Sequence, residues 1–280
     1  MISWEQAVQS LIDDPSNQSL VKACYFDSPV GLAAERFWKS TEWKALSTLL
    51  SSKLGQALDL GAGRGISSYA LARDGWDVTA LEPDPSPLVG SGAINRLIEE
   101  TQLPITVTAE FSECLPFENN KFDLVYCRQA LHHANDLELT CNEISRVLRA
   151  GGMFVATREH VITHQEDLGL FLAQHPLHNL YGGENAYQLK TYKKAICDSG
   201  LKLLRVIHPY DSPINYFPAT AQQVDDLCTR SYYRFLGKRF SDLILSDSFV
   251  RPYLASVGRI YENLRNNLPG RLYSFVAVKP

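Results

Sequence analysis

No long basic run, no close pair of cysteines and no apolar stretch of membrane-spanning length occurs among the 280 residues of the chain. Binding of nucleic acid requires clustered Lys and Arg against the phosphates, and the net charge here is −4, so nucleic acid is not expected as a partner. A bilayer-spanning helix needs about 20 apolar residues in a row. We therefore expect no membrane partner either.

The first residues lack the basic segment and the apolar segment that together mark a secretory signal. The six cysteines are scattered, and none has the C-x-x-C spacing of a zinc knuckle or a redox motif. Free thiols suit a reducing compartment, so a cytoplasmic location is expected. Hydrophobic residues make up 45% and charged residues 21% of the chain, which is ordinary for a globular protein and excludes pervasive disorder or a coiled coil.

Short apolar runs alternate with amphipathic segments through most of the chain. The runs predict buried strands and the segments predict helices. Strands that alternate with helices are joined by crossover connections, which give a parallel sheet covered on both faces. We therefore predict a doubly wound α/β fold. The predicted strands are 56–60, 77–81, 105–108, 122–127, 153–157, 201–207 and 272–278, and the predicted helices between them are 67–73, 93–100, 137–148 and 186–198.

Two longer segments, 158–184 and 209–270, interrupt this alternation. The second is too long for a loop inside a compact domain, so it predicts a helical insertion. Its apolar spacing favours helices at 221–236 and 253–264. The first segment is rich in His, Tyr, Gly and Glu, which suits a loop that covers a polar substrate.

The first 53 residues also have helical patterns, and Ser3 with Gln6 has the spacing of a capping box. We therefore divide the chain into an N-terminal helical cap, 1–53, and a main domain, 54–280. The insertions at 158–184 and 209–270 are expected to form a lid over the substrate site of the main domain.

The first predicted strand ends in Leu58-Asp-Leu-Gly-Ala-Gly-Arg-Gly65. Glycines at this point allow a tight turn and let a ligand approach the backbone at a helix N-terminus. The pattern is G-x-G-x-G rather than the G-x-G-x-x-G of dinucleotide folds. Asp59 would repel a pyrophosphate and suits a ligand that carries an ammonium group, so a nucleoside bearing an amino acid is favoured over NAD.

An acidic residue, Glu82, closes the second predicted strand. A carboxylate there can accept hydrogen bonds from both hydroxyls of a ribose. The glycine loop and this acid would lie at neighbouring strand ends. Their joint occurrence predicts a nucleoside site at the carboxyl edge of the sheet.

With three further segments, these motifs resemble the class I S-adenosylmethionine-dependent methyltransferases, in particular the small-molecule enzymes of methyltransferase type 11. The matching segments are Leu58–Gly65, Leu81-Glu-Pro-Asp84, Glu113-Cys-Leu-Pro-Phe117, Phe122–His133 and Leu148-Arg-Ala-Gly-Gly152. They occur in the family's order and at its usual spacing. The resemblance implies a Rossmann-like, seven-stranded and mostly parallel sheet whose last strand is antiparallel, with S-adenosylmethionine bound across the carboxyl ends of the first strands.

The resemblance also implies roles for individual residues in the cofactor site. Asp59, Gly61 and Gly63 would contact the methionine end, Glu82 and Pro83 the ribose, Phe111 and Ser112 the adenine, and Arg128 and Gln129 would close the site. The family often has an aspartate where Phe111 stands, and Glu110 can substitute for its contact with the adenine amino group.

Methyl transfer to a hydroxyl needs a general base near the operating pH, for which histidine is the usual side chain. The predicted catalytic histidines are His160, His178 and His133, and the predicted substrate-binding residues are His175, Tyr181, Glu184 and Asn185. For the His132-His133 pair, a structural role in the loop is the other interpretation. No metal is predicted, because the four-residue spacing of His160 and His164 is not diagnostic outside a clear helix.

The predicted function is therefore transfer of a methyl group from S-adenosylmethionine to a small polar acceptor, at a hydroxyl such as that of a sugar. Two alternatives stay open: a lipid or quinone-like acceptor, and a non-catalytic S-adenosylmethionine-binding regulator. An NAD-dependent oxidoreductase is disfavoured by Asp59 and by the glycine spacing.

Overall fold

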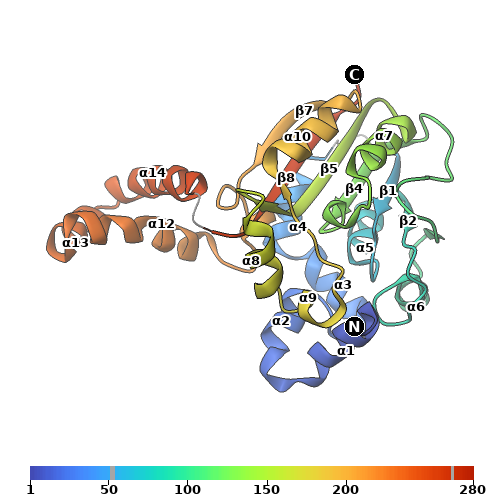
Figure 1. Cartoon of the computed structure of the whole chain (residues 1–280), viewed down its shortest axis with the longest axis horizontal. Coiled ribbons are helices and arrows are strands. Elements are labelled where there is room, and N and C mark those ends of the chain that lie inside the picture. Colours follow the sequence, from blue (N-terminus) through green and yellow to red (C-terminus); the bar gives the residue numbers. More distant parts are fainter. Residues whose placement is uncertain (51–53, 266–267) are drawn as a thin grey trace.

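The computed structural model describes residues 1–50, 54–265 and 268–280, and its centre is one twisted sheet (Figure 1). Seven strands follow the order β3-β2-β1-β4-β5-β8-β7, and the two-residue β6 pairs with β5. The pairs from β3 to β5 are parallel, whereas β8 runs antiparallel to both of its neighbours. The strands are β1 (Gln56–Leu60), β2 (Asp77–Leu81), β3 (Ile105–Thr108), β4 (Phe122–Arg128), β5 (Leu148–Ile162), β6 (Tyr187–Gln188), β7 (Lys202–Ile207) and β8 (Arg271–Val278). The predicted doubly wound sheet with an antiparallel last strand is confirmed.

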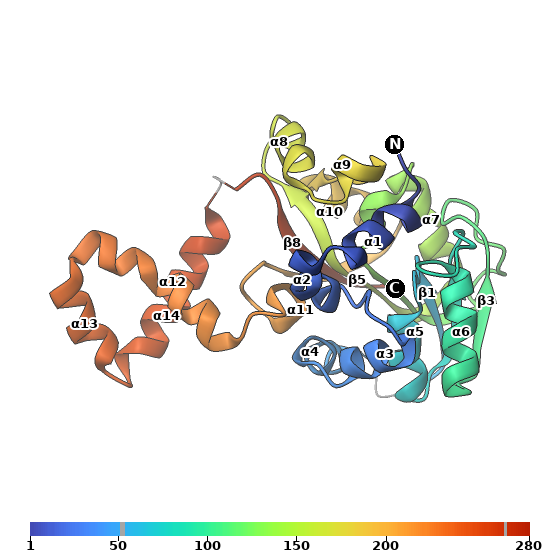
Figure 2. The ribbon, with the colours of Figure 1, turned by 90° about the horizontal axis from the view of Figure 1, so that it is seen from below.

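Helices cover both faces of the sheet, as Figure 2 shows. On one face lie α3 (Val30–Trp38), α4 (Thr41–Ser47), α5 (Ile66–Arg73) and α6 (Ser91–Thr101), and on the other lie α7 (Leu137–Val147) and α10 (Leu189–Asp198). Each face has its own apolar core. Phe37, Trp43 and Leu71 are buried on the first side, and Ile144 and Tyr192 on the second.

Four further helices gather beyond the carboxyl ends of the parallel strands (Figure 1). They are α1 (Trp4–Asp13), α2 (Gln18–Ala23), α8 (Asp167–Gln174) and α9 (His178–Tyr181), and short 3-10 turns lie at Pro15–Asn17 (η1) and Leu131–His133 (η2). The predicted Ser3–Gln6 capping box opens α1. The N-terminal segment packs against the 158–184 insertion, since the rings of Trp4 and Tyr181 lie 4.7 Å apart. The two segments therefore cover one edge of the sheet together.

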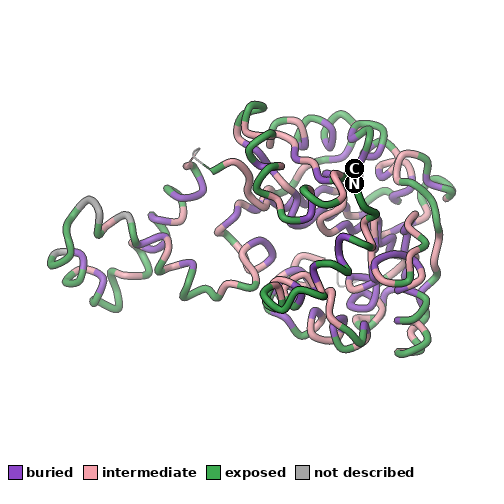
Figure 3. The backbone as a smooth tube through the Cα atoms, turned by 60° about the horizontal axis from the view of Figure 1, so that its bottom comes forward, coloured by how far each residue is buried: buried purple, intermediate pink, exposed green. Residues whose placement is uncertain are grey.

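The second insertion forms a helical arm that projects away from the sheet (Figures 1 and 2). After α11 (Pro213–Tyr216), the arm consists of α12 (Ala221–Leu236), α13 (Lys238–Ser246) and α14 (Val250–Leu264). The predicted helix at 221–236 is confirmed, and the one predicted at 253–264 starts three residues earlier. Buried and exposed positions alternate along the arm (Figure 3), where Phe249 is 89% exposed. None of the described helices is both long enough and apolar enough to cross a membrane.

The largest departure from the predicted secondary structure is the length of β5. The apolar pattern predicted a strand at 153–157, but the observed strand extends from Leu148 to Ile162. Its last residues pair with β8 beyond an irregularity between Ala156 and Glu159, where Arg158 adopts a positive φ of 61°. This local change of register carries Glu159 and His160 to the carboxyl edge of the sheet. The predicted boundary between 53 and 54 falls at residues 51–53, outside the described residues.

Candidate active site

A cavity of about 450 Å³ opens at the carboxyl ends of β1, β2, β4 and β5. At one end it is bordered by the glycine loop after β1, by Glu82 and by residues 110–113. At the other end it is bordered by residues of η2, β5, α9 and the N-terminal helices, among them His132, His160 and Tyr181. Two groups of predicted site residues, far apart in the sequence, therefore share one cavity.

The glycine loop and Glu82 are joined by a hydrogen bond. Gly63 N–H donates to Glu82 Oε2 at 2.7 Å, and Asp84 N–H donates to Glu82 Oε1 at 3.0 Å. Gly61 and Gly63 have φ values of 68° and 54°, a region that favours glycine. A Cβ on Gly61 would lie 2.7 Å from the side chain of Ala130, whereas a Cβ on Gly63 would find its nearest neighbour at 3.8 Å. The loop therefore presents bare backbone to the cavity beside a carboxylate.

Asp59 is buried beneath this loop rather than placed at the cavity wall. Its Oδ2 accepts a hydrogen bond from Ser68 Oγ at 2.6 Å, and the side chain is 1% exposed. Burial raises the pKa of Asp59 to about 7, and the charge of Glu82 acts in the same direction. The described cavity lining does not include Asp59, so its predicted contact with an ammonium group stays a prediction.

The predicted adenine contacts, Phe111 and Ser112, both line the cavity. Phe111 is 63% exposed at its rim, and Ser112 Oγ lies 3.3 Å from Thr140 Oγ1. Glu110 also lines the cavity.

Arg128 and Gln129 follow directly at the end of β4. Arg128 makes a two-pronged ion pair with Glu42 of α4, at 2.7 and 3.1 Å, and its Nη1 donates to Gln129 Oε1 at 3.0 Å. Burial alone would lower the pKa of Arg128, but the charge of Glu42 outweighs it and raises that pKa. Glu42 is 1% exposed, and the sequence analysis missed it because an acidic residue in the first turn of a helix is common on surfaces.

The other end of the cavity holds a cluster of histidines and glutamates. His132 is fixed by Glu159, whose Oε2 lies 2.7 Å from His132 Nδ1 and also accepts from His132 N–H at 3.0 Å. The other oxygen of Glu159 accepts from the backbone N–H groups of Ala130 and Leu131, both at 3.2 Å. Glu159 is fully buried, so this carboxylate holds the whole of η2 in place.

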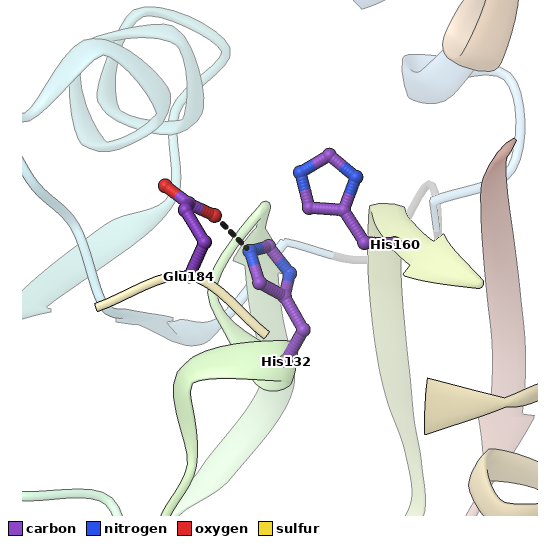
Figure 4. A group of neighbouring side chains, drawn as sticks. All are labelled: His132, His160 and Glu184. Carbon is purple, nitrogen blue, oxygen red and sulfur yellow. Dashed lines mark ion pairs between the residues drawn. The ribbon is translucent and has the colours of Figure 1, made fainter. Parts of the chain in front are cut away.

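Glu184, after α9, faces His132 (Figure 4) on its Nε2 side, whereas Glu159 faces Nδ1. Glu184 Oε2 lies 3.6 Å from His132 Nε2 and 3.9 Å from the Nε2 atoms of His133 and His175. Its other oxygen accepts a hydrogen bond from Tyr181 Oη at 2.7 Å. The ring of His160 stands beside that of His132, with 4.5 Å between their centroids.

The charges in this cluster separate the histidines into two kinds. Burial would lower the pKa of His132, but its hydrogen bond with Glu159 and the charges of Glu159 and Glu184 raise that pKa to about 9. Burial lowers the pKa of His160 well below its ordinary value, and the neighbouring His132 lowers it further. The same two causes lower the pKa of His133. At neutral pH, His132 therefore carries the positive charge while His160 and His133 are neutral.

The structure thus brings together most of the residues that the sequence analysis named for catalysis and substrate binding. His133, His160, His175, Tyr181 and Glu184 all line the cavity. The described lining does not include His178 or Asn185, nor any residue of 209–270. Residues of 158–184 thus border the cavity and those of 209–270 do not, and the division into a main domain with a lid stays a prediction.

Glu159, which orders the cluster, was absent from the sequence-based site. The predicted strand ended at Thr157, so nothing in the apolar pattern marked the next residues as buried. The Arg158-Glu159-His160 sequence directly after an apolar run was the available signal.

His132 gives the stability of the protein a defined pH dependence. Its pKa is about 9 in the folded chain and near 6.5 when unfolded, so its stabilisation is complete below pH 6.5 and is lost as the pH rises toward 9. The pKa values of His133 and His160 are lowered, so these two histidines titrate below this pH range. We expect denaturant titrations to show a difference in unfolding free energy between wild type and His132→Asn that shrinks from about pH 6.5 to 8.5, by up to ~1.4 kcal/mol per pH unit. A constant difference would contradict this assignment of charge.

The doubly wound sheet, the antiparallel last strand and the glycine loop bonded to an acid after β2 define a Rossmann-like nucleoside-binding domain. Residues 58–156 match the family model described as Methyltransferase domain. Residues 58–156 of the chain thus resemble a methyltransferase domain.

Curated relatives agree with this class. An uncharacterized methyltransferase of Mycobacterium tuberculosis is 36% identical over 128 residues, which are 45% of this chain and 49% of that protein. The match therefore spans about half of that relative's length. A ubiquinone biosynthesis O-methyltransferase of Rhizobium etli is 25% identical over 189 residues, 66% of this chain and 73% of that protein.

Solved structures resemble the whole fold. Geranyl diphosphate methyltransferase in complex with S-adenosylmethionine covers 97% of this chain and 95% of its own, with a TM-score of 0.58 and 15% identity. Phosphoethanolamine N-methyltransferase 2 of Haemonchus contortus covers 100% of this chain and 60% of its own, with a TM-score of 0.55 and 18% identity. At these identities the likeness is one of fold.

Proposed function

We propose that the protein is an S-adenosylmethionine-dependent methyltransferase that acts on a hydroxyl of a small polar acceptor. The observation that carries the proposal is the single cavity that joins the glycine loop and Glu82 to the histidine and glutamate cluster. Two substrates must meet in one water-poor space for a methyl group to pass directly between them.

The cofactor half fits a nucleoside that carries an amino acid. The bare backbone at Gly61 and Gly63 leaves room for the methionine end, and the carboxylate of Glu82 with Pro83 is placed for the ribose. Phe111 and Ser112 border the remaining space, which suits adenine. Arg128, held by Glu42, and Gln129 close the site at the end of β4. When bound, S-adenosylmethionine supplies a methyl group activated by its sulfonium.

Of the predicted catalytic histidines, His133 is the best-placed general base. Its Nδ1 lies 3.1 Å from the carbonyl oxygen of Gly183, to which it can only donate, so the lone pair of the neutral ring is on Nε2. His133 lines the cavity, and its lowered pKa keeps Nε2 unprotonated at neutral pH. His160 is the second candidate on the cavity wall, and His178 remains a prediction.

The acceptor half offers both polar and apolar surface. His175, Tyr181 and Glu184 can hydrogen-bond a polar group, whereas Trp4 and Leu177 supply an apolar wall. This wall favours an acceptor that combines hydroxyls with a ring or a short apolar part. A quinone-like phenol, as in the name of the Rhizobium etli relative, is the second candidate beside a sugar.

Calorimetric titration of the purified protein with S-adenosylmethionine, S-adenosylhomocysteine and NAD tests the cofactor. We expect micromolar binding of the two sulfur nucleosides and none of NAD. Turnover assays with sugars and with phenols then decide the acceptor class. Failure of both sulfur nucleosides to bind would overturn the proposal, and binding without turnover on any acceptor would leave a regulator as the function.

Replacing Glu82 with alanine should weaken binding of S-adenosylhomocysteine by about 1–3 kcal/mol, because two ribose hydrogen bonds to a charged group and the anchor of the Gly63 amide are lost. Isothermal titration measures the change. Glu99→Ala is the matched control, since Glu99 is an exposed acid on α6. Equal affinity of Glu82→Ala and the control would refute the ribose assignment.

A further inference from the structure

Three side chains of types that can bind a metal ion come from separate segments and meet in the acceptor half of the cavity (Figure 4). His132 lies in η2 after β4, His160 lies on β5, and Glu184 follows α9. One donor atom from each lies within 4.8 Å of the others. The chain brings two imidazoles and a carboxylate together across about 50 residues of sequence separation, and His133 and His175 each lie 3.9 Å from Glu184.

The separation of the donors suits a metal better than a direct hydrogen bond. His132 Nε2 and Glu184 Oε2 are 3.6 Å apart, too far for a strong hydrogen bond. A tetrahedral zinc ion with bonds of about 2.0–2.1 Å holds its ligands about 3.4 Å from one another. The two donors are therefore already close to the spacing that one ion would impose. Among the described residues, no hydrogen bond occupies a ring nitrogen of His160, whose ring packs between those of His132 and Phe171 at centroid distances of 4.5 and 5.0 Å.

Outer partners orient two of the three donors toward that point. Glu159 Oε2 accepts from His132 Nδ1 at 2.7 Å, which leaves the lone pair of a neutral His132 on Nε2. Tyr181 Oη donates to Glu184 Oε1, which leaves Oε2 facing the histidines. A carboxylate on the far nitrogen of a histidine is the usual support of a metal-bound imidazole.

We propose that His132, His160 and Glu184 bind a divalent transition-metal ion such as Zn²⁺. Three protein ligands leave a fourth position of the ion open to the cavity. The inference goes beyond the proposed function and does not depend on it. The sequence analysis predicted no metal from the spacing of His160 and His164, and His164 is exposed and lies outside this cluster.

In the metal-free chain, protonated His132 is neutralised by its two glutamates, and binding of the ion must release that proton. The competing account is that the cluster binds no ion. Titration of the EDTA-treated, full-length protein with Zn²⁺ alone separates the two accounts. We expect one Zn²⁺ per chain, and no binding of Mg²⁺ under the same conditions, because Mg²⁺ prefers oxygen ligands. No saturable Zn²⁺ binding, or equal binding of Mg²⁺, would overturn the proposal.

Variants locate the site. Glu184→Gln keeps an oxygen for Tyr181 and removes the charged ligand, so we expect it to bind Zn²⁺ at least about 100-fold more weakly, since loss of even an outer partner costs 10- to 100-fold. His160→Ala should have the same effect, and the matched control, His164→Ala, should keep wild-type affinity. Unchanged Zn²⁺ affinity in both ligand variants, or an equal loss in His164→Ala, would refute the site.

Two further measurements distinguish failure of the metal proposal from failure of the proposed function. Thermal unfolding and S-adenosylhomocysteine affinity report the fold and the cofactor half of each variant. If Zn²⁺ does not bind while S-adenosylhomocysteine does, the metal site is wrong and the proposed function stands. If Zn²⁺ binds and S-adenosylhomocysteine does not, the metal site stands and the proposed function fails.

Discussion

Replacing His133 with alanine should lower kcat by about 100- to 10,000-fold, the usual contribution of a positioned general base. The Kd for S-adenosylhomocysteine should change by less than about twofold, because His133 lies at the acceptor end of the cavity, away from the glycine loop and Glu82. In the proposed reaction, Nε2 of the neutral ring would take the acceptor's proton, because Nδ1 donates to the carbonyl of Gly183. Steady-state kinetics with an identified acceptor and calorimetry together measure both quantities.

The pH profile distinguishes a base from a merely structural histidine. His133 must be neutral to act, and its pKa is lowered by partial burial and by the charge of His132, so wild-type kcat should fall only below about pH 6.5. In His133→Ala this acid limb should vanish. His164→Ala, at an exposed position, is the control. An unaltered limb with kcat near the wild-type value would exclude His133 as the base.

Replacing Glu159 with alanine should lower the free energy of unfolding by about 3–5 kcal/mol. The fully buried carboxylate accepts from three backbone N–H groups and from the ring of His132, whose charge would then lie buried with a partner on one side only. Removal of one member of a buried pair leaves an uncompensated charge, and the three orphaned amides add their own desolvation cost. Urea unfolding followed by two spectroscopic probes measures the loss.

Glu138→Ala is the matched control for that measurement. Glu138 pairs with Lys194 at 2.9 Å, but both side chains are about two-thirds exposed, so the change should stay within about 0.5 kcal/mol. If Glu159→Ala is no more destabilising than this control, the carboxylate does not hold η2. Glu159 also orients His132. The Zn²⁺ affinity of a folded Glu159→Gln variant measures that second role.

Much of the fold could be predicted because its signals are local. Most residues of the runs at 56–60, 77–81 and 122–127 are buried, and burial on both faces makes the centre of a parallel strand mainly apolar. The glycine loop and Glu82 could be predicted for a related reason. Each directly follows a strand, and the ends of adjacent parallel strands necessarily meet at one edge of the sheet.

For the acceptor half of the cavity, the sequence predicted individual residues but not their arrangement. His160, His175 and Glu184 were predicted as separate residues of one insertion, and nothing in their spacing indicated that His132 would complete a cluster with two of them. For the helical arm, the secondary structure was predicted but the position was not. Helical periodicity correctly predicted 221–236, but periodicity does not report direction, and α12 extends away from the cavity that it was expected to cover.

The sequence by itself determined the doubly wound sheet, the order of its strands with helices and the position of the nucleoside site, because these depend on residue patterns within a few turns of chain. Only the tertiary structure decided which acids and histidines face one another. The irregularity in β5 turns Glu159 under η2, and the packing of α9 against the N-terminal helix brings Glu184 over His132. These contacts depend on register and packing between distant segments, and a low-dielectric interior then fixes which of the histidines carries charge.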